Sequence, residues 1–189
     1  MPNWCNNNIE LSHPDKAMVE RAVKAFADGT LLNEFIPLPK ELEDTISPVR
    51  ESDETLVAKY GHSDWYSWCV NNWGTKWDIS PYGVEINEHG VLVGAFDSPW
   101  GPPIEAYSKF EELGFEVRAY YNEPGMGFAG VYEDGFDESF NYSGMSADEA
   151  EDYLPEALNE MYGITENMRE WEAENQEIEL NHGIDSINE

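Results

Sequence analysis

Carboxylate groups are the most abundant reactive side chains in this sequence, and they become denser toward its C-terminal end. The 189 residues include 39 acidic and 10 basic side chains, which gives a formal net charge of −29. Residues 119–189 contain 19 of the acids and a single base, Arg169. A surface of this sign repels phosphate groups, so we expect no direct binding of nucleic acid and instead a partner with a basic surface.

Two predicted helices near the C-terminus carry most of these acids. Ser146 and Glu149 have the spacing of a capping box for the first helix, and Thr165 is suited to begin the second. The six glutamates of residues 166–179 correspond to roughly one charge per 3.5 Å of helix, close to the ~3.4 Å per charge along one strand of duplex DNA. We expect the following acids to contact the partner: Asp148, Glu149, Glu151, Asp152, Glu156, Glu160, Glu166, Glu170, Glu174 and Glu177.

The acidity has two simpler possible causes, namely a merely solvated helix face and an adaptation to high salt. Salt adaptation should spread the charge evenly. The net charge is instead −11 over residues 1–118 (20 acids, 9 bases) and −18 over residues 119–189 (19 acids, 1 base). Like charges four positions apart, such as Glu166 and Glu170, also destabilise an isolated helix by about 0.2–0.5 kcal/mol per pair. The segment therefore has either strong tertiary support or a use for its negative field.

A second group of polar residues lies among tryptophans. Lys76 is a cation in an acidic chain, and it would bind an anion if the strands around it formed a small pocket. The residues of this possible pocket are Trp73, Thr75, Lys76, Trp77, Asp78, Asp97 and Trp100. The favoured alternative is that the tryptophans belong to the core and that Lys76 pairs with Asp78 or Asp97.

The remaining motifs give little support for catalysis. Residues 125–130 match the G-x-G-x-x-G pattern of dinucleotide-binding loops, but the residues that follow predict a strand, which favours a glycine-rich hairpin. The acids of residues 133–138 are typical of a solvated loop rather than a cation site. The four histidines lack the spacing of zinc ligands. We therefore expect no enzymatic activity, cofactor or metal.

Hydrophobic periodicity predicts one α+β domain followed by an acidic helical segment. The expected elements are strands at 4–12, 76–79, 84–86, 91–96, 115–121 and 128–132, helices at 14–28, 63–73 and 102–113, and a long loop at 41–59. This order predicts a ferredoxin-like antiparallel sheet with helices on one face. The domain covers residues 1–142, with a long insertion around residues 30–75, and the acidic helical segment covers residues 143–189.

Three tryptophan-bearing motifs suggest a relationship to known proteins. They are Met1-Pro-Asn-Trp-Cys-Asn-Asn7, Trp73-Gly-Thr-Lys-Trp-Asp78 and Phe96-Asp-Ser-Pro-Trp-Gly-Pro-Pro103. Together they resemble the YubB-type ferredoxin-like family of phage and plasmid proteins over about residues 1–132. The resemblance implies a ferredoxin-like core and a mobile-element origin. It implies no catalytic residues, and the acidic C-terminal segment lies outside it.

These observations lead to one main hypothesis and two alternatives. The main hypothesis is a phage or plasmid accessory protein that inhibits a nucleic-acid-binding defence protein of the host by imitating DNA. The first alternative is an interaction module that uses an aromatic sheet face, and the second is a small ligand-binding domain or enzyme around residues 73–78. The sequence has no apolar run long enough for a membrane span and no secretory signal, so we expect it in the host cytoplasm. It leaves the partner and the oligomeric state open.

Overall fold

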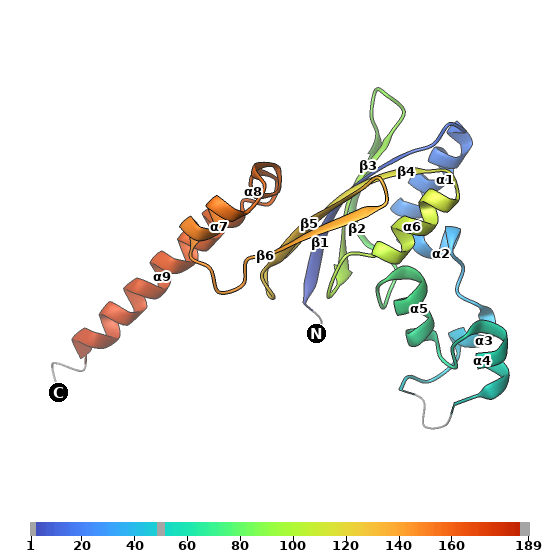
Figure 1. Ribbon diagram of the computed structural model, residues 1–189, viewed down its shortest axis with the longest axis horizontal. Helices are drawn as coiled ribbons and strands as arrows, with labels where there is room; N and C mark the ends of the chain where they lie inside the picture. Colours follow the sequence, from blue (N-terminus) through green and yellow to red (C-terminus); the bar gives the residue numbers. More distant parts are fainter. Residues whose placement is uncertain (1–2, 49–51, 186–189) are drawn as a thin grey trace.

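The computed structural model describes residues 3–48 and 52–185, with the side chains of the last helix described as far as residue 175. Its centre is a six-stranded antiparallel sheet in the order β2-β3-β1-β4-β5-β6 (Figure 1). The strands are β1 Trp4–Ser12, β2 Ser80–Ile86, β3 Leu92–Pro99, β4 Glu116–Glu123, β5 Phe128–Glu133 and β6 Phe136–Asn141.

The first four strands form the ferredoxin-like part of the sheet. They alternate with the helices α1 (Lys16–Ala27) and α6 (Ile104–Glu112) in the order β1, α1, β2, β3, α6, β4. Because successive side chains of a strand point to opposite faces, Ile9 and Leu11 of β1 lie on one face, where they are buried against the apolar stripes of α1 and α6. The α+β fold class predicted from the sequence is confirmed.

The insertion between α1 and β2 is helical and shares this core. Its helices are α2 Leu31–Phe35, α3 Lys40–Glu43, α4 Glu54–Tyr60 and α5 Trp65–Trp73. Leu42 and Trp68 are buried in the same cluster as α1 and α6. The prediction of a long loop at residues 41–59 is therefore wrong, since most of α3 and most of α4 fall inside it. No residue of α4 is fully buried, and its apolar stripe, with Leu56 and Tyr60 partly buried against the core, is too short to predict a helix.

One strand prediction and one loop prediction also need correction. Residues 76–79 do not begin a strand, and β2 starts at Ser80. Residues 133–138 are not a loop, because β5 and β6 form a hairpin with Asp134 and Gly135 at its turn, where φ is 52° and 78°. Five of the six residues of β6 are exposed, so this edge strand lacks the alternation that predicts strands.

The C-terminal helices pack on the opposite face of the sheet. They are α7 Ala147–Tyr153, α8 Glu156–Tyr162 and α9 Ile164–Asp185. Leu154, Leu158 and Ile164 form a second hydrophobic cluster with Ala129 of β5. The helices are therefore not confined to one face. Beyond this cluster, α9 extends away from the sheet, at the end of the molecule opposite α3 and α4 (Figure 1).

The two cysteines, Cys5 and Cys69, are both buried and form no disulfide. Burial raises the pKa of the Cys69 thiol to about 12, which leaves it protonated at neutral pH. Within the part of the chain that the structure describes, no helix is both long enough and apolar enough to cross a membrane.

Gly130 provides a test of the sheet packing. A Cβ atom at Gly130 would lie 2.2 Å from the Tyr121 hydroxyl oxygen and 2.5 Å from the Glu138 carbonyl oxygen. The Tyr121 side chain can therefore lie over Gly130 only because glycine has no side chain. We expect Gly130→Ala to lower the free energy of unfolding by about 2 kcal/mol or more in urea denaturation. Gly83→Ala is the matched control, since its Cβ would meet nothing within 4 Å. Equal stability of the two variants would contradict this packing.

Candidate functional site

The three tryptophan-bearing motifs meet where β1 begins and β3 ends. Trp4 lies opposite Pro99 in the sheet register, and its ring centroid is 6.5 Å from that of Trp77. The backbone N–H of Trp100 donates to the Asn3 carbonyl oxygen at 2.9 Å. The residues Trp4, Trp77 and Trp100 are each more than 40% exposed. Trp4 was not predicted to line the pocket, although it belongs to the first of the three tryptophan-bearing motifs.

Lys76 forms cation–π contacts with this cluster. Its ammonium nitrogen lies 4.2 Å from the ring centroid of Trp77 and 5.5 Å from that of Trp100. Lys76 takes part in none of the ion pairs formed by the described residues. The expected pairing with Asp78 or Asp97 is therefore wrong.

Trp73, Thr75 and Asp78 have structural contacts instead of facing a pocket. The indole nitrogen of buried Trp73 donates to the Ile36 carbonyl oxygen at 2.9 Å. The Asp78 carboxylate accepts hydrogen bonds from the backbone N–H groups of Leu32 and Asn33, at 2.9 and 2.8 Å, and so fixes the start of α2. Burial raises the pKa of Asp78, and these hydrogen bonds oppose that shift. Thr75 is buried and donates to a carbonyl oxygen of β3.

Asp97 lies nearby on β3 and belongs to a separate hydrogen-bond network. Its carboxylate accepts a hydrogen bond from Asn6 Nδ2 at 2.7 Å and another from the hydroxyl of Tyr82. The seven residues of the possible pocket therefore divide into three sets: the exposed Trp77 and Trp100 with the half-buried Lys76, the structural residues Trp73, Thr75 and Asp78, and the Asp97 network. Among the described residues, no group of three or more His, Cys, Asp or Glu side chains is arranged to hold a metal ion.

The acidic helices are attached to the sheet through the junction of α8 and α9. The Tyr162 hydroxyl donates to the Tyr120 carbonyl oxygen at 2.8 Å and accepts from Asn8 Nδ2 at 3.0 Å. Burial raises the pKa of Tyr162 well above its usual value, so the phenol keeps its proton and can donate. These bonds connect the junction to two central strands, β1 and β4. No local pattern indicates the role of Tyr162, because its partners are distant along the chain.

Helix α7 is held against α9 by ionic and hydrogen-bonding contacts. Arg169 of α9 pairs with Asp148 at 3.1 Å and also with Glu151. Glu172 of α9 accepts a hydrogen bond from the Ala147 backbone N–H at 2.8 Å, at the first turn of α7. A carboxylate at this position is favoured by the helix dipole. The two acidic helices are therefore joined, although both carry negative charge.

The ten predicted acids are not equivalent in the structure. Asp148 and Glu151 are paired with Arg169. Glu149 completes the predicted capping box, and hydrogen bonds from the backbone and hydroxyl of Ser146 lower the pKa of its carboxyl group. The predicted acids with exposed side chains and no ion pair within the described residues are Asp152, Glu156, Glu160, Glu166, Glu170 and Glu174. The side chain of Glu177 lies outside the described residues.

The glycine-rich segment at residues 125–130 forms a turn and the first part of β5. The buried carboxylate of Glu123 accepts hydrogen bonds from the backbone N–H groups of Gly125 and Met126, at 3.0 and 2.7 Å. These two N–H groups already donate to the Glu123 side chain, and a strand follows the glycines instead of a helix. The structural context that a dinucleotide-binding loop requires is therefore missing.

Comparison with known proteins adds little to this description. No protein-family model matches the chain, and no curated protein matches it. Among solved structures, the chain is similar to protein api92 from Yersinia pseudotuberculosis, described as a DUF1281 protein. The similarity covers 76% of this chain and 99% of that chain, at 14% sequence identity and a TM-score of 0.41.

Arg169 allows a test of how α7 is held. We expect Arg169→Gln to leave Asp148 and Glu151 without a cation and to weaken the docking of α7 by about 1 kcal/mol, since both pairs are exposed. Backbone amides of α7 should then exchange hydrogen roughly fivefold faster, while those of β1 and β4 keep their rates. Arg21→Gln, which breaks the exposed Arg21–Glu34 pair, is the matched control. Unchanged exchange in α7 would show that Arg169 does not hold it.

Proposed function

We propose that this protein binds the basic, nucleic-acid-binding surface of another protein through the carboxylates of α7, α8 and α9, in place of nucleic acid. The observation that carries the proposal is the fixed attachment of these helices to the sheet. Their one base, Arg169, is used between α7 and α9. The exposed glutamates of α9 are therefore left to interact with a cationic partner.

The spacing of these glutamates favours an electrostatic role. Glu166, Glu170 and Glu174 succeed one another at four-residue intervals, or roughly 6 Å along the helix axis. Repulsion between such neighbours destabilises a helix by about 0.2–0.5 kcal/mol per pair. The buried contacts of Ile164 and Leu158 offset this cost in the free protein. Because the helix is already ordered, little conformational entropy is lost when a partner binds its carboxylates.

The biological setting is part of the same proposal. A protein with this surface would act as an accessory protein of a phage or plasmid, as the resemblance of its tryptophan motifs to YubB-type proteins implies. Its partner would be a host defence protein that grips phosphate groups with Lys and Arg side chains. Two free, buried cysteines suit the reducing cytoplasm of the host cell.

The exposed tryptophan cluster supports a second candidate function, a binding site that does not imitate DNA. Trp100 has a φ of 69°, a backbone conformation that is unfavourable for a non-glycine residue and that clusters at binding sites. If these rings hold a partner, changing Trp77 or Trp100 to Ala should abolish its binding. Neutralising the glutamates of α9 should leave that binding unchanged.

The main proposal predicts salt-sensitive competition with DNA. Proteins retained by DNA-cellulose from a bacterial lysate should bind the immobilised protein, and duplex DNA should displace them. Changing Glu166, Glu170 and Glu174 together to Gln should weaken this binding about tenfold at low salt, since exposed ion pairs contribute roughly 0.2–1 kcal/mol each. The difference should shrink as the salt concentration rises, because salt screens exposed charges.

The control is a variant with the same net charge. Glu43, Glu88 and Glu112 are exposed acids of the α+β domain, and changing all three to Gln should leave binding unchanged. Equal loss in both triple variants would show that only net charge matters. Proteins that stay bound in the presence of excess DNA would contradict competition for a nucleic-acid-binding surface.

A further inference from the structure

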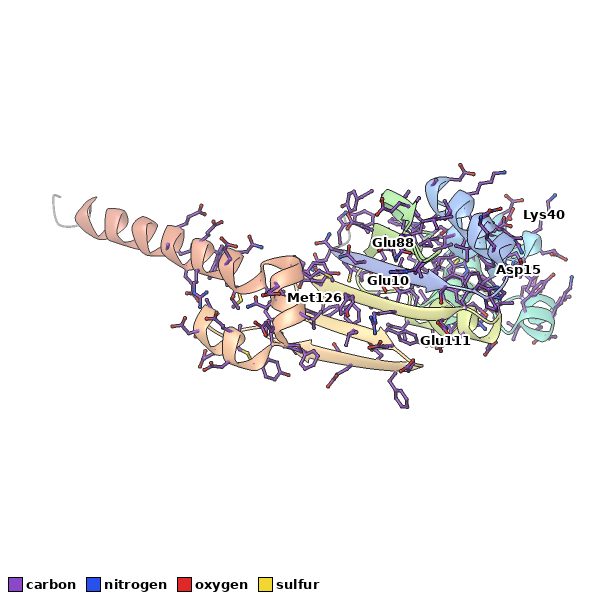
Figure 2. The ribbon with its side chains drawn as sticks, turned by 90° about the horizontal axis from the view of Figure 1, so that it is seen from above. Glu10, Asp15, Lys40, Glu88, Glu111 and Met126 are labelled. Carbon is purple, nitrogen blue, oxygen red and sulfur yellow. The ribbon has the colours of Figure 1, made fainter. Side chains whose placement is uncertain are left out.

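An open groove lies between the sheet and the first turns of α9. Its volume is about 630 Å³, which is within the range of ligand-binding clefts. The connection between β4 and β5 forms one wall, residues 142–145 form another, and α9 contributes Ile164, Met168 and Trp171. Figure 2 shows Met126, on the β4–β5 connection, where the sheet meets the C-terminal helices.

The lining of this groove is mostly apolar and adaptable. It includes the methionines Met126, Met145 and Met168, and no charged side chain contributes to it. Methionine side chains are flexible and polarisable, so surfaces rich in them adjust to different apolar partners. Met126 is 56% exposed and Trp171 is 67% exposed. Two large apolar side chains on one groove are therefore left with uncovered surface.

The apolar stripe of α9 continues beyond the part that the sheet covers. Ile164 is buried and Met168 is partly buried against the second hydrophobic cluster, whereas Trp171, one turn further, is mostly exposed. The positions 164, 168 and 171 share one face of a helix with 3.6 residues per turn. Packing against the second hydrophobic cluster explains the apolar side chains of Ile164 and Met168. It does not explain why a large apolar side chain, Trp171, is exposed one turn further.

Carboxylates flank the Trp171 end of this stripe. At about 100° per residue, Glu174 and Glu170 lie roughly 60° and 100° around the helix from Trp171, on the side away from Arg169 and Glu172. Arg169 and Glu172 contact α7, so Glu170 and Glu174 are the free glutamates nearest Trp171, whereas Glu166 lies on the far side of α9 from Ile164. A segment lying over Trp171 would therefore meet an apolar ring and carboxylates side by side.

We propose that the groove binds the apolar face of a basic amphipathic helix that belongs to the partner protein. This inference rests on the proposed function and specifies the partner element. A helix presents neighbouring apolar and basic stripes at angles like those between Trp171 and the glutamates. A β-strand does not, since its alternate side chains point in opposite directions. A second copy of this chain is a poor occupant, because its α9 carries the same acids and would repel this one.

The test uses three fluorescent peptides of about 18 residues. The first combines Leu and Lys at helical spacing, the second has the same composition in an order without helical periodicity, and the third contains Lys and Gly at the same charge. We expect the wild type to bind the amphipathic peptide at least tenfold more tightly than either of the others. Equal affinity for the amphipathic and scrambled peptides would overturn the groove proposal.

Variants separate the groove from the charge. Trp171→Ala combined with Met126→Gln should weaken the amphipathic peptide about tenfold and leave the Lys/Gly peptide unchanged. Phe136→Ala, at a side chain that is 79% exposed on β6, is the matched control and should change neither. The triple glutamate variant should weaken both peptides. Because Trp171 and Met126 are exposed, these substitutions should preserve the circular dichroism of the wild type.

The two proposals fail in different ways. If the Trp171 and Met126 variant binds all peptides like the wild type, the groove proposal is wrong and the acidic surface stands. If the triple glutamate variant binds the Lys/Gly peptide like the wild type, the acidic surface itself is wrong. Concentration-dependent dimerisation of the wild type that is lost in the Trp171 and Met126 variant would assign the groove to a second copy and overturn the proposal.

Discussion

The hydroxyl group of Tyr162 connects the acidic helices to the rest of the protein. It donates to a backbone carbonyl of β4 and accepts from an asparagine side chain of β1, so one partly buried group fixes the α8–α9 junction to the centre of the sheet. The apolar contacts of Leu158 and Ile164 surround this point. Without this attachment, α9 would be a highly charged helix whose direction relative to the sheet was not defined.

The negative charge of the segment is both the obstacle to its structure and the basis of its proposed function. Two helices rich in carboxylates repel each other, and α7 packs on α9 because Arg169 lies between Asp148 and Glu151. Glu172 adds a carboxylate at the start of α7, where the backbone N–H groups favour it. These contacts use some acids to hold the segment together. The rest of the exposed acids, together with the adjoining apolar groove, form the surface that we propose binds a partner.

Local patterns predicted much of the fold. Strand β1 and helices α1, α5 and α6 have clear periodicity and turn residues, and the order of elements indicated the ferredoxin-like sheet. The patterns failed where burial is weak, as in α4, which buries no residue, and in β6, which is almost wholly exposed. The placement of α7 to α9 on the second face depends on contacts between residues distant in sequence, such as Tyr162 with Asn8, and no local pattern encodes them.

The candidate sites, like the fold, were predicted only where a local sequence pattern marks them. Composition identified the acidic segment and motif spacing identified the tryptophans, but neither revealed which carboxylates were already engaged. Asp148 and Glu151 look the same in sequence as Glu166 and Glu170, and only the position of Arg169 separates them. The groove was missed because Met126 and Trp171 come from segments far apart in the chain that meet only in the folded protein.

The central claim is that α9 presents its glutamates from a fixed position relative to the sheet. Spin labels at Glu10→Cys on β1 and Glu174→Cys on α9 would measure this by pulsed electron paramagnetic resonance, since Cys5 and Cys69 are buried and protonated thiols. A fixed α9 predicts one narrow distance distribution between the labels, at low salt and at high salt alike. A broad distribution, extending over many distances in the free protein, would contradict it.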